Sequence, residues 1–463
     1  MTVKRRAILH IGTPKTGSTS IQAFLQHHRD MLLTHGVVFA ASPGRRNHLA
    51  LAVLGAGEAY TGYALTPAGG GGDPQSLGPR LQRDLATEMA ALGDDVHTVV
   101  FSSEQISRLS SPTEVERVRG LLAPHFESIR VLVYLRRQDE LAVSQYSTAL
   151  RAGGETSASV LPAAGEEAGF YNLAGVVESY AAIFGQAAIM PRIFDRISLV
   201  GGDVVRDFLE VCGVVGVDTG KPTSNPALRA DVQEFVRRFN VAVEERGLAD
   251  RPRLGQYLRD SKFQGKARLP TRSEAQAFLE RFRESNDRLR ISYFPDRAVL
   301  FAEDFSRYPE TADVDAISDA RVLRVALDIV VDLSGELRLA QFAAAFRAGE
   351  AAEAAGRLVE ARQHYSHALQ GEKDNKLAKQ ALLRLDRIQA KAGGETAKGA
   401  QRRGLADGKA GRKREQDSGA SLAPDAAAVP PAGTAPDAVP PEAARDTDRA
   451  ARRAKRKAER RAA

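Results

Sequence analysis

A glycine-rich turn stands between a short apolar segment and an amphipathic helix near the start of the chain. Residues 7–11 have the length and composition of a buried strand, and residues 18–31 have the apolar spacing of a helix. Between them lies the sequence Gly-Thr-Pro-Lys-Thr-Gly at residues 12–17. A turn from a strand into a helix N-terminus directs free backbone N–H groups at an anion. The segment therefore predicts a phosphate-binding loop.

Strand-like and helix-like segments continue to alternate after this loop. Residues 37–40, 98–102 and 129–135 are short, apolar and bounded by turn residues, and residues 138–151 have helical spacing. This alternation predicts an α/β fold with a parallel sheet flanked by helices. Four consecutive glycines at residues 69–72 predict a mobile lid or an insertion between the second and third strands.

The loop differs from a Walker A loop in the position of its lysine. Gly12 and Gly17 have the Walker spacing, but Ser18 stands where the lysine belongs, and Lys15 precedes the second glycine. Such a loop can hold one phosphate, with Lys15 beside the group being transferred. The residues expected to hold that phosphate are Thr16, Gly17, Ser18, Thr19 and Ser20. A glycine turn without a ligand and a diverged kinase loop are the alternatives.

The segment Pro14-Lys15-Thr16-Gly17-Ser18-Thr19 resembles the 5′-phosphosulfate loop of sulfotransferases that use 3′-phosphoadenosine 5′-phosphosulfate (PAPS). The resemblance implies that residues 14–20 bind the 5′-phosphate and that Lys15 neutralises charge on the bridging oxygen. In this family an arginine at a strand end and a serine eight residues later bind the 3′-phosphate. Arg136 and Ser144 stand at those positions. The chain is similar to a bacterial branch of the family over about residues 6–308, although it has no clear Arg-Lys-Gly triplet.

Two residues are candidates for the general base, the group that takes the proton from the substrate that receives the sulfuryl group. Glu104 follows the third strand, at the edge where ligands bind open α/β sheets, and the resemblance implies a catalytic Glu or His near this strand end. His48 follows the second strand, and a histidine titrates near neutral pH. A helix-capping carboxylate and a structural histidine are the alternatives. The nine histidines have no metal-ligand spacing, so we expect no catalytic metal.

The net charge of +7 is concentrated at the C-terminus. Residues 393–463 hold 16 basic and 10 acidic side chains and no aromatic residue, which predicts a disordered tail. Residues 339–392 are helical and alanine-rich, with Gly349 and Tyr365 at positions that resemble a tetratricopeptide repeat; an ordinary helical hairpin is the alternative. We therefore expect a sulfotransferase domain at 1–312, a connecting helix or linker at 313–338, this helical segment, and the tail.

Taken together, these patterns predict a PAPS-dependent sulfotransferase that acts on a hydroxyl or amine of a carbohydrate, lipid or small metabolite. A P-loop kinase, another nucleotide-binding protein and a catalytically inactive adaptor are the alternatives. The alanine- and arginine-rich composition favours a bacterial source, and with it a carbohydrate or glycolipid acceptor.

The cellular context is predicted more coarsely. No apolar stretch approaches 18 residues, and Cys212 is the single cysteine, so we expect no membrane span, no disulfide framework and a cytoplasmic protein. The helical segment is a candidate site for a protein partner. The basic tail is a candidate contact for an anionic surface, such as the inner membrane face, and a solubilising end is the alternative.

Overall fold

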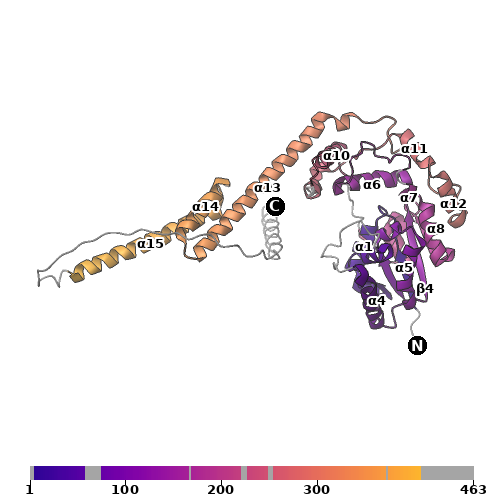
Figure 1. Cartoon of the computed structure of the whole chain (residues 1–463), viewed down its shortest axis with the longest axis horizontal. Coiled ribbons are helices and arrows are strands. Elements are labelled where there is room, and N and C mark those ends of the chain that lie inside the picture. The colour runs from indigo at the N-terminus through magenta and orange to yellow at the C-terminus, as the bar shows by residue number, and fades with distance from the viewer. Residues whose placement is uncertain are drawn as a thin grey trace. The chain divides into compact units, whose positions relative to one another are not determined.

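The computed structural model (Figure 1) describes residues 5–57, 74–165, 168–220, 227–248, 254–371 and 374–407. Its contacts divide the chain into two units, residues 1–378 and 379–463. The four glycines at 69–72 lie outside the described residues, as do residues 408–463 of the predicted tail. Residues 393–407, which were also expected to belong to the tail, continue the helix α15 (Lys376–Asp407).

The first unit contains a five-stranded parallel sheet with the strand order β2-β3-β1-β4-β5. The strands are β1 (Arg6–His10), β2 (Val37–Phe39), β3 (Thr98–Ser102), β4 (Ser128–Leu135) and β5 (Ile189–Ile193). The predicted parallel sheet flanked by helices is thus confirmed. The sequence pattern does not indicate β5, because Pro191 and Arg192 interrupt its apolar run. An edge strand tolerates such residues, since only one of its sides needs hydrogen bonds.

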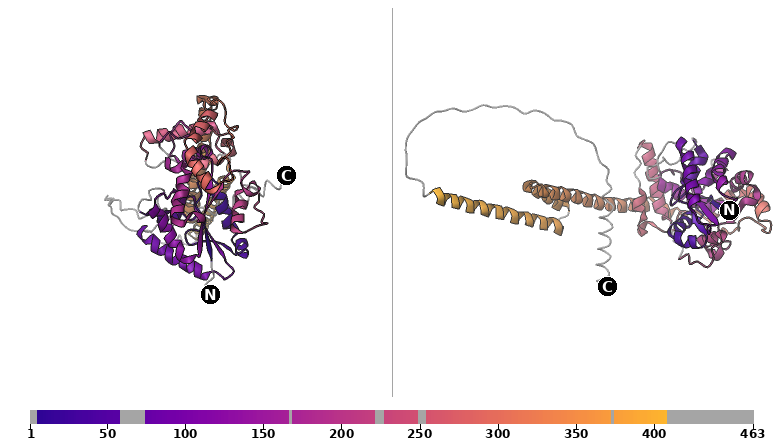
Figure 2. Two further views of the ribbon diagram at one scale, coloured as in Figure 1. Left: turned by 90° about the vertical axis from the view of Figure 1, so that its right-hand side faces the viewer. Right: turned by 90° about the horizontal axis from the view of Figure 1, so that it is seen from below.

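Alternate strand residues belong to two separate cores, one on each side of the sheet. Helices cover both of these sides (Figure 2). Ile8, Val100 and Leu132 pack on one side with α1 (Ser18–His27), α2 (Arg29–Thr34) and α9 (Val204–Cys212). The other side is covered by α3 (Leu49–Ala56), α4 (Pro74–Ala91), α5 (Pro112–Leu122) and α8 (Leu173–Phe184). The helix expected over residues 18–31 is divided at His28, whose backbone leaves helical geometry at φ −114° and ψ 31°.

A further group of helices packs around α6 (Gln138–Ala152), which follows β4. Its core is shared with α10 (Ala230–Glu245), α11 (Arg272–Glu280) and the first part of α13 (Asp319–Ala354). Two more helices, α7 (Ala168–Tyr171) and α12 (Arg283–Tyr293), complete this region. The chain thus extends well beyond the sheet before its C-terminal helices begin.

The end of α13 and α14 (Leu358–Gly371) form a helical hairpin. The ring of Tyr365 lies so close to Gly349 that a Cβ there would be 2.6 Å from it, and the Tyr365 hydroxyl donates to Glu353 at 2.8 Å. The small residues expected at this crossing are therefore where the two helices touch. Because α13 is continuous, the expected boundary at 338/339 falls inside a helix. The assignment of residues 339–392 to a tetratricopeptide-like unit stays a prediction.

A buried ion pair fixes the segment after α12 to the end of β4. Arg137 donates to both carboxylate oxygens of Asp139, at 2.8 and 2.9 Å, and to the carbonyls of Ala302 and Asp304, at 2.6 and 2.9 Å. The Tyr308 hydroxyl donates to Asp139 at 2.5 Å. The Arg137 side chain is only 7% exposed and that of Asp139 is fully buried, so each charge depends on the other.

Replacing Arg137 should therefore be costly. Arg137→Ala leaves the Asp139 carboxylate buried without its cation and should lower the free energy of unfolding by about 3–5 kcal/mol, measured by urea denaturation. The neighbouring Arg136→Ala is the matched control, because its partner Glu140 keeps an ion pair with Arg307 at 3.1 Å. It should cost about 1 kcal/mol. Equal losses in the two variants would contradict this account of Arg137.

Candidate active site

The loop after β1 lies at the centre of the carboxyl edge of the sheet. The chain leaves β1 toward β2 on one side, whereas β4 leads to β5 on the other. The carboxyl ends of β1 and β4 therefore form a topological switch point, the place where open α/β sheets bind ligands. Glu104 after β3, Arg136 after β4 and Phe194 after β5 begin at the same edge. This is the edge that the sequence predicted for the site.

The loop has the conformation of an anion cradle. Gly17 precedes α1 with φ +80°, and Lys15 also has a positive φ of 65°. A Cβ at Gly17 would lie 2.7 Å from the Val204 side chain. The position therefore requires glycine both for its positive φ and for lack of space. In the described part of the chain, no acceptor takes the backbone N–H groups of Thr16, Gly17, Ser18 and Thr19. These groups are available to a phosphate, because a helix N-terminus leaves its first N–H groups unpaired.

Tyr134 in β4 holds the loop in place. Its carbonyl accepts from the N–H and the hydroxyl of Thr13, at 3.1 and 3.0 Å, and its own N–H donates to Gly12. Its phenol donates at 2.8 Å to the buried carboxylate of Asp207 in α9, and Arg192 binds the same carboxylate at 2.5 Å. Burial and the Asp207 charge raise the pKa of the Tyr134 hydroxyl. The loop, the sheet and α9 are thus joined through one residue.

Lys15 and Arg136 meet above this loop. Arg136 Nη1 donates to the Lys15 carbonyl at 3.0 Å, and its guanidinium lies 5.6 Å from the centre of the Phe194 ring. Burial lowers the pKa of the Lys15 ammonium, as do Arg136 and Arg151, whereas Glu104 raises it. Burial also lowers the pKa of Arg136, and its neighbour Glu140, 3.3 Å from Nε, opposes this. Both cations are therefore held where an added anion would stabilise their charge.

Glu104 lies next to the loop and is held by hydrogen bonds. A Cβ at Gly12 would lie 2.9 Å from Glu104 Cβ, so the two backbones are in contact. Gln22 Nε2 donates to Glu104 Oε2 at 3.1 Å and to Ser102 Oγ at 3.2 Å. Ser102 Oγ is 2.8 Å from His10 Nδ1, and burial lowers the pKa of His10 to about 3, so that ring is neutral. A neutral Nδ1 can accept the Ser102 proton, which directs the serine's lone pairs toward Gln22.

His48 is buried between β2 and β3, and both of its ring nitrogens bond to backbone. Nδ1 accepts from the Ser102 N–H at 3.0 Å, and Nε2 lies 3.0 Å from the Ala40 carbonyl, to which it donates. The ring is stacked on Phe39, and burial lowers the pKa of His48 to about 3. A neutral ring with both nitrogens engaged has no lone pair left for a substrate proton.

The other predicted site residues are placed less closely together. Ser144 is half-buried in α6, and in the described residues no hydrogen bond joins it to Arg136 or to the loop. Thr16 donates its hydroxyl to the Thr13 carbonyl at 2.5 Å, within the loop itself. The Ser18 hydroxyl is buried and finds no partner among the described residues.

Sequence reasoning missed several residues of this region. Gln22 has no motif of its own and is recognised only through its contact with Glu104. Glu140 lies four residues after Arg136 in the sequence, so its pairing follows helical spacing and could have been anticipated. Arg307, which pairs with Glu140, lies far away in the sequence and gives no such signal.

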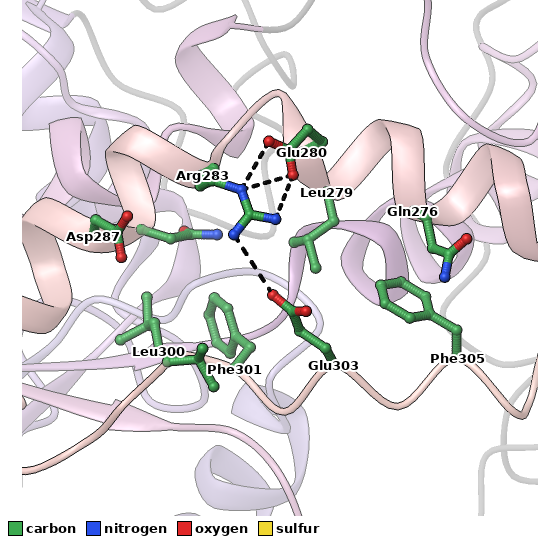
Figure 3. A pocket seen from close by; sticks show the side chains of 11 residues that line it. Gln276, Leu279, Glu280, Arg283, Asp287, Leu300, Phe301, Glu303 and Phe305 are labelled. Atoms are coloured by element: carbon green, nitrogen blue, oxygen red, sulfur yellow. Dashed lines mark hydrogen bonds and ion pairs between the residues drawn. The ribbon is translucent and has the colours of Figure 1, made fainter.

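A separate pocket lies between α11, α12 and the segment 299–305 (Figure 3). Leu300 and Phe301 form part of an apolar wall of this pocket. Arg283, which also lines the pocket, contacts the carboxylates of Glu280 and Glu303. Hydrogen bonds and ion pairs of the described residues connect none of the lining side chains to Lys15, Glu104 or Arg136. Among these described residues, no group of His, Cys, Asp and Glu has the arrangement to hold a metal ion, and no helix is long and apolar enough to cross a membrane.

Comparisons with known proteins give partial similarities, and no protein-family model matches the chain. An uncharacterized protein of Archaeoglobus fulgidus is 28% identical over 219 residues, which are 45% of this chain and 58% of that protein. The chain thus matches less than two thirds of that relative. The crystal structure of a sulfotransferase from Alicyclobacillus acidocaldarius is 17% identical and superposes with a TM-score of 0.31, over 48% of this chain and 88% of the other.

Stability should depend on pH through the two buried histidines. Their pKa values are about 3 in the folded chain and 6.5 ordinarily, so the unfolded state binds protons first as the pH falls. Stability is then complete above pH 6.5 and decreases toward pH 3, by about 1.4 kcal/mol per pH unit for each histidine. The free energy of unfolding, measured with urea, should decrease between pH 7 and pH 5 in the native chain. In His48→Gln this decrease should be smaller by about 2 kcal/mol. His10→Gln should behave alike, and an unchanged difference in both variants would refute the assignment.

Proposed function

We propose that this chain is a PAPS-dependent sulfotransferase whose donor site is the loop after β1. The observation that carries the proposal is the 3.0 Å hydrogen bond between Arg136 and the Lys15 carbonyl, beside four backbone N–H groups that no acceptor among the described residues takes. This arrangement brings two cations and a helix N-terminus to one point of the sheet edge. It suits a donor that carries two separate phosphate groups rather than a triphosphate, since the Walker lysine is absent.

The loop residues 14–20 would bind the 5′-phosphate through their N–H groups and the buried Ser18 hydroxyl. Arg136 would bind the 3′-phosphate, because its planar guanidinium matches two phosphate oxygens at once. Ser144 would join it through a movement of either side chain. Binding of the donor would offset the repulsion between Lys15, Arg136 and Arg151 that lowers the pKa of Lys15.

For the transfer itself, we assign the proton acceptor to Glu104. The acceptor's oxygen or nitrogen attacks the sulfur in line, forming the new bond as the bond from sulfur to the bridging phosphate oxygen breaks. The proton passes to the Glu104 carboxylate, and Lys15 stabilises the negative charge that develops on the leaving phosphate. Gln22 holds the carboxylate toward this position. His48 is the less suitable base, because both of its nitrogens bond to backbone.

The remaining assignments follow from the sequence. We propose residues 1–312 as the catalytic domain, a helical segment at 339–392 that binds a protein partner, and a cytoplasmic protein whose basic tail contacts an anionic surface. A carbohydrate or glycolipid acceptor is supported by the composition, which is typical of bacterial proteins. Labelled PAPS with fractionated host glycans and lipids would identify the acceptor.

Donor binding tests the first half of the proposal. Lys15→Ala and Arg136→Ala should each weaken the binding of 3′-phosphoadenosine 5′-phosphate by roughly 10- to 100-fold in calorimetry, because each removes a charge-assisted contact. Arg130→Ala, at the opposite end of the same strand β4, is the control and should bind as the native chain does. The assignment would be overturned if both site variants bound the donor with native affinity. It would also be overturned if the native chain had a magnesium-dependent ATPase activity.

Turnover tests the second half. At saturating PAPS, Glu104→Gln should lose roughly 100-fold or more in turnover while it binds the donor normally, because an amide cannot accept the proton. Gln22→Leu should lose turnover to a smaller extent. Gln22→Glu places a second carboxylate beside Glu104, so the pH profile of turnover in this variant should move to higher pH. Full turnover in Glu104→Gln would show that another group accepts the proton.

A further inference from the structure

The middle of α13 carries apolar side chains that the described chain leaves uncovered. Leu323, Leu327, Val330 and Leu337 are 56–60% exposed, and Val331 is 69% exposed. The opposite side of the same stretch is anchored in the core shared with α10. Its buried residues are Val322, Val325 and Ile329. The helix is thus apolar on two sides, of which only one packs against other described residues.

The spacing of the exposed side chains is that of a helix that pairs with another helix. From Leu323 the steps are four residues to Leu327, three to Val330, four to Ser334 and three to Leu337. This 4-3-4-3 pattern keeps all five on one stripe, as in the a and d positions of a heptad repeat. None of the five is charged, and the Ser334 hydroxyl is satisfied by the Val330 carbonyl at 2.7 Å.

We propose that this stripe is the interface between two copies of the chain. Two identical stripes related by a two-fold axis bury only uncharged residues against one another. The stripe with Val331 exposes on the order of 500 Å² of apolar surface per copy, so that a pair buries roughly 1,000 Å², close to the minimum of a specific interface. A single apolar patch of this size on a monomer is already at the upper end of what is usual.

The chain's own C-terminal residues are poor candidates for covering the stripe. Residues 408–463 contain only Leu422, Val429 and Val439 as large aliphatic side chains, and these are widely spaced among alanine, proline and charge. A second copy, in contrast, supplies a stripe of matching length and spacing. The proposal does not depend on the donor site or on the reaction.

Sedimentation of the full-length chain tests the proposal. The native chain should have twice the mass of one copy at micromolar concentrations, and Leu327→Glu and Val330→Glu should sediment as single copies, because each places a charge in the apolar seam. Leu339→Glu is the matched control, since Leu339 is 58% exposed but points away from the stripe. It should remain dimeric. Circular dichroism should show the same helix content in all variants, whereas the unfolding temperature should fall in the variants that lose the partner copy.

Crosslinking locates the interface independently of mass. Val330 is the midpoint of the stripe, so it meets its own copy whether the two helices run parallel or antiparallel. Val330→Cys should therefore be joined by a short bis-maleimide, and Leu339→Cys should not. Cys212, the single native cysteine, is fully buried and gives no background. A monomeric native chain, a dimer that survives both glutamate variants, or equal crosslinking of the two cysteine variants would overturn the proposal.

Discussion

The hydrogen bonds of Tyr134 are the interaction on which the arrangement of the candidate site depends. Its backbone holds the turn after β1, and its phenol donates to Asp207, which Arg192 binds from the next strand. Through Asp207 the same residue fixes α9, whose Val204 packs against Gly17. The start of α1 is therefore held from below by the sheet and from the side by α9. The turns of this loop are too short to hold their own geometry, so its exposed N–H groups keep a common direction only through this support.

Several charged groups surround the candidate site. Arg136 and Arg151 are close enough to Lys15 to lower the pKa of its ammonium, and Glu104, next to the loop at the end of β3, is close enough to raise it. Helix α1 adds the partial positive charge of its N-terminus. An anionic ligand is thus drawn to the loop while a carboxylate stays beside it, with Gln22 keeping that carboxylate in place. Cations and a carboxylate thus lie close together at this edge of the sheet.

The sheet and the loop could be predicted from the sequence, because both depend on local patterns. Buried central strands form short apolar runs, and a glycine turn between a strand and a helix is recognisable from a few adjacent residues. Strand β5 could not be predicted, since an edge position permits Pro191. The environment of His48 was also hidden. Its partners are backbone groups of β3 and of the end of β2, which come together only in the folded sheet. The adjacent residues Arg136 and Arg137 cannot be told apart from the sequence. In the fold, Arg136 is the more exposed cation, whereas Arg137 is buried in an ion pair with Asp139.

Gly12 sets a distance that no other residue could set. Its φ of +99° and the closeness of Glu104, whose Cβ lies 2.9 Å from where a side chain would begin, bring the end of β1 directly against the start of the segment after β3. The backbones of Gly12 and Glu104 are therefore in direct contact, with no side chain between them. By contributing no side chain, Gly12 allows the segment that begins at Glu104 to approach the end of β1 more closely than any other residue at this position would permit.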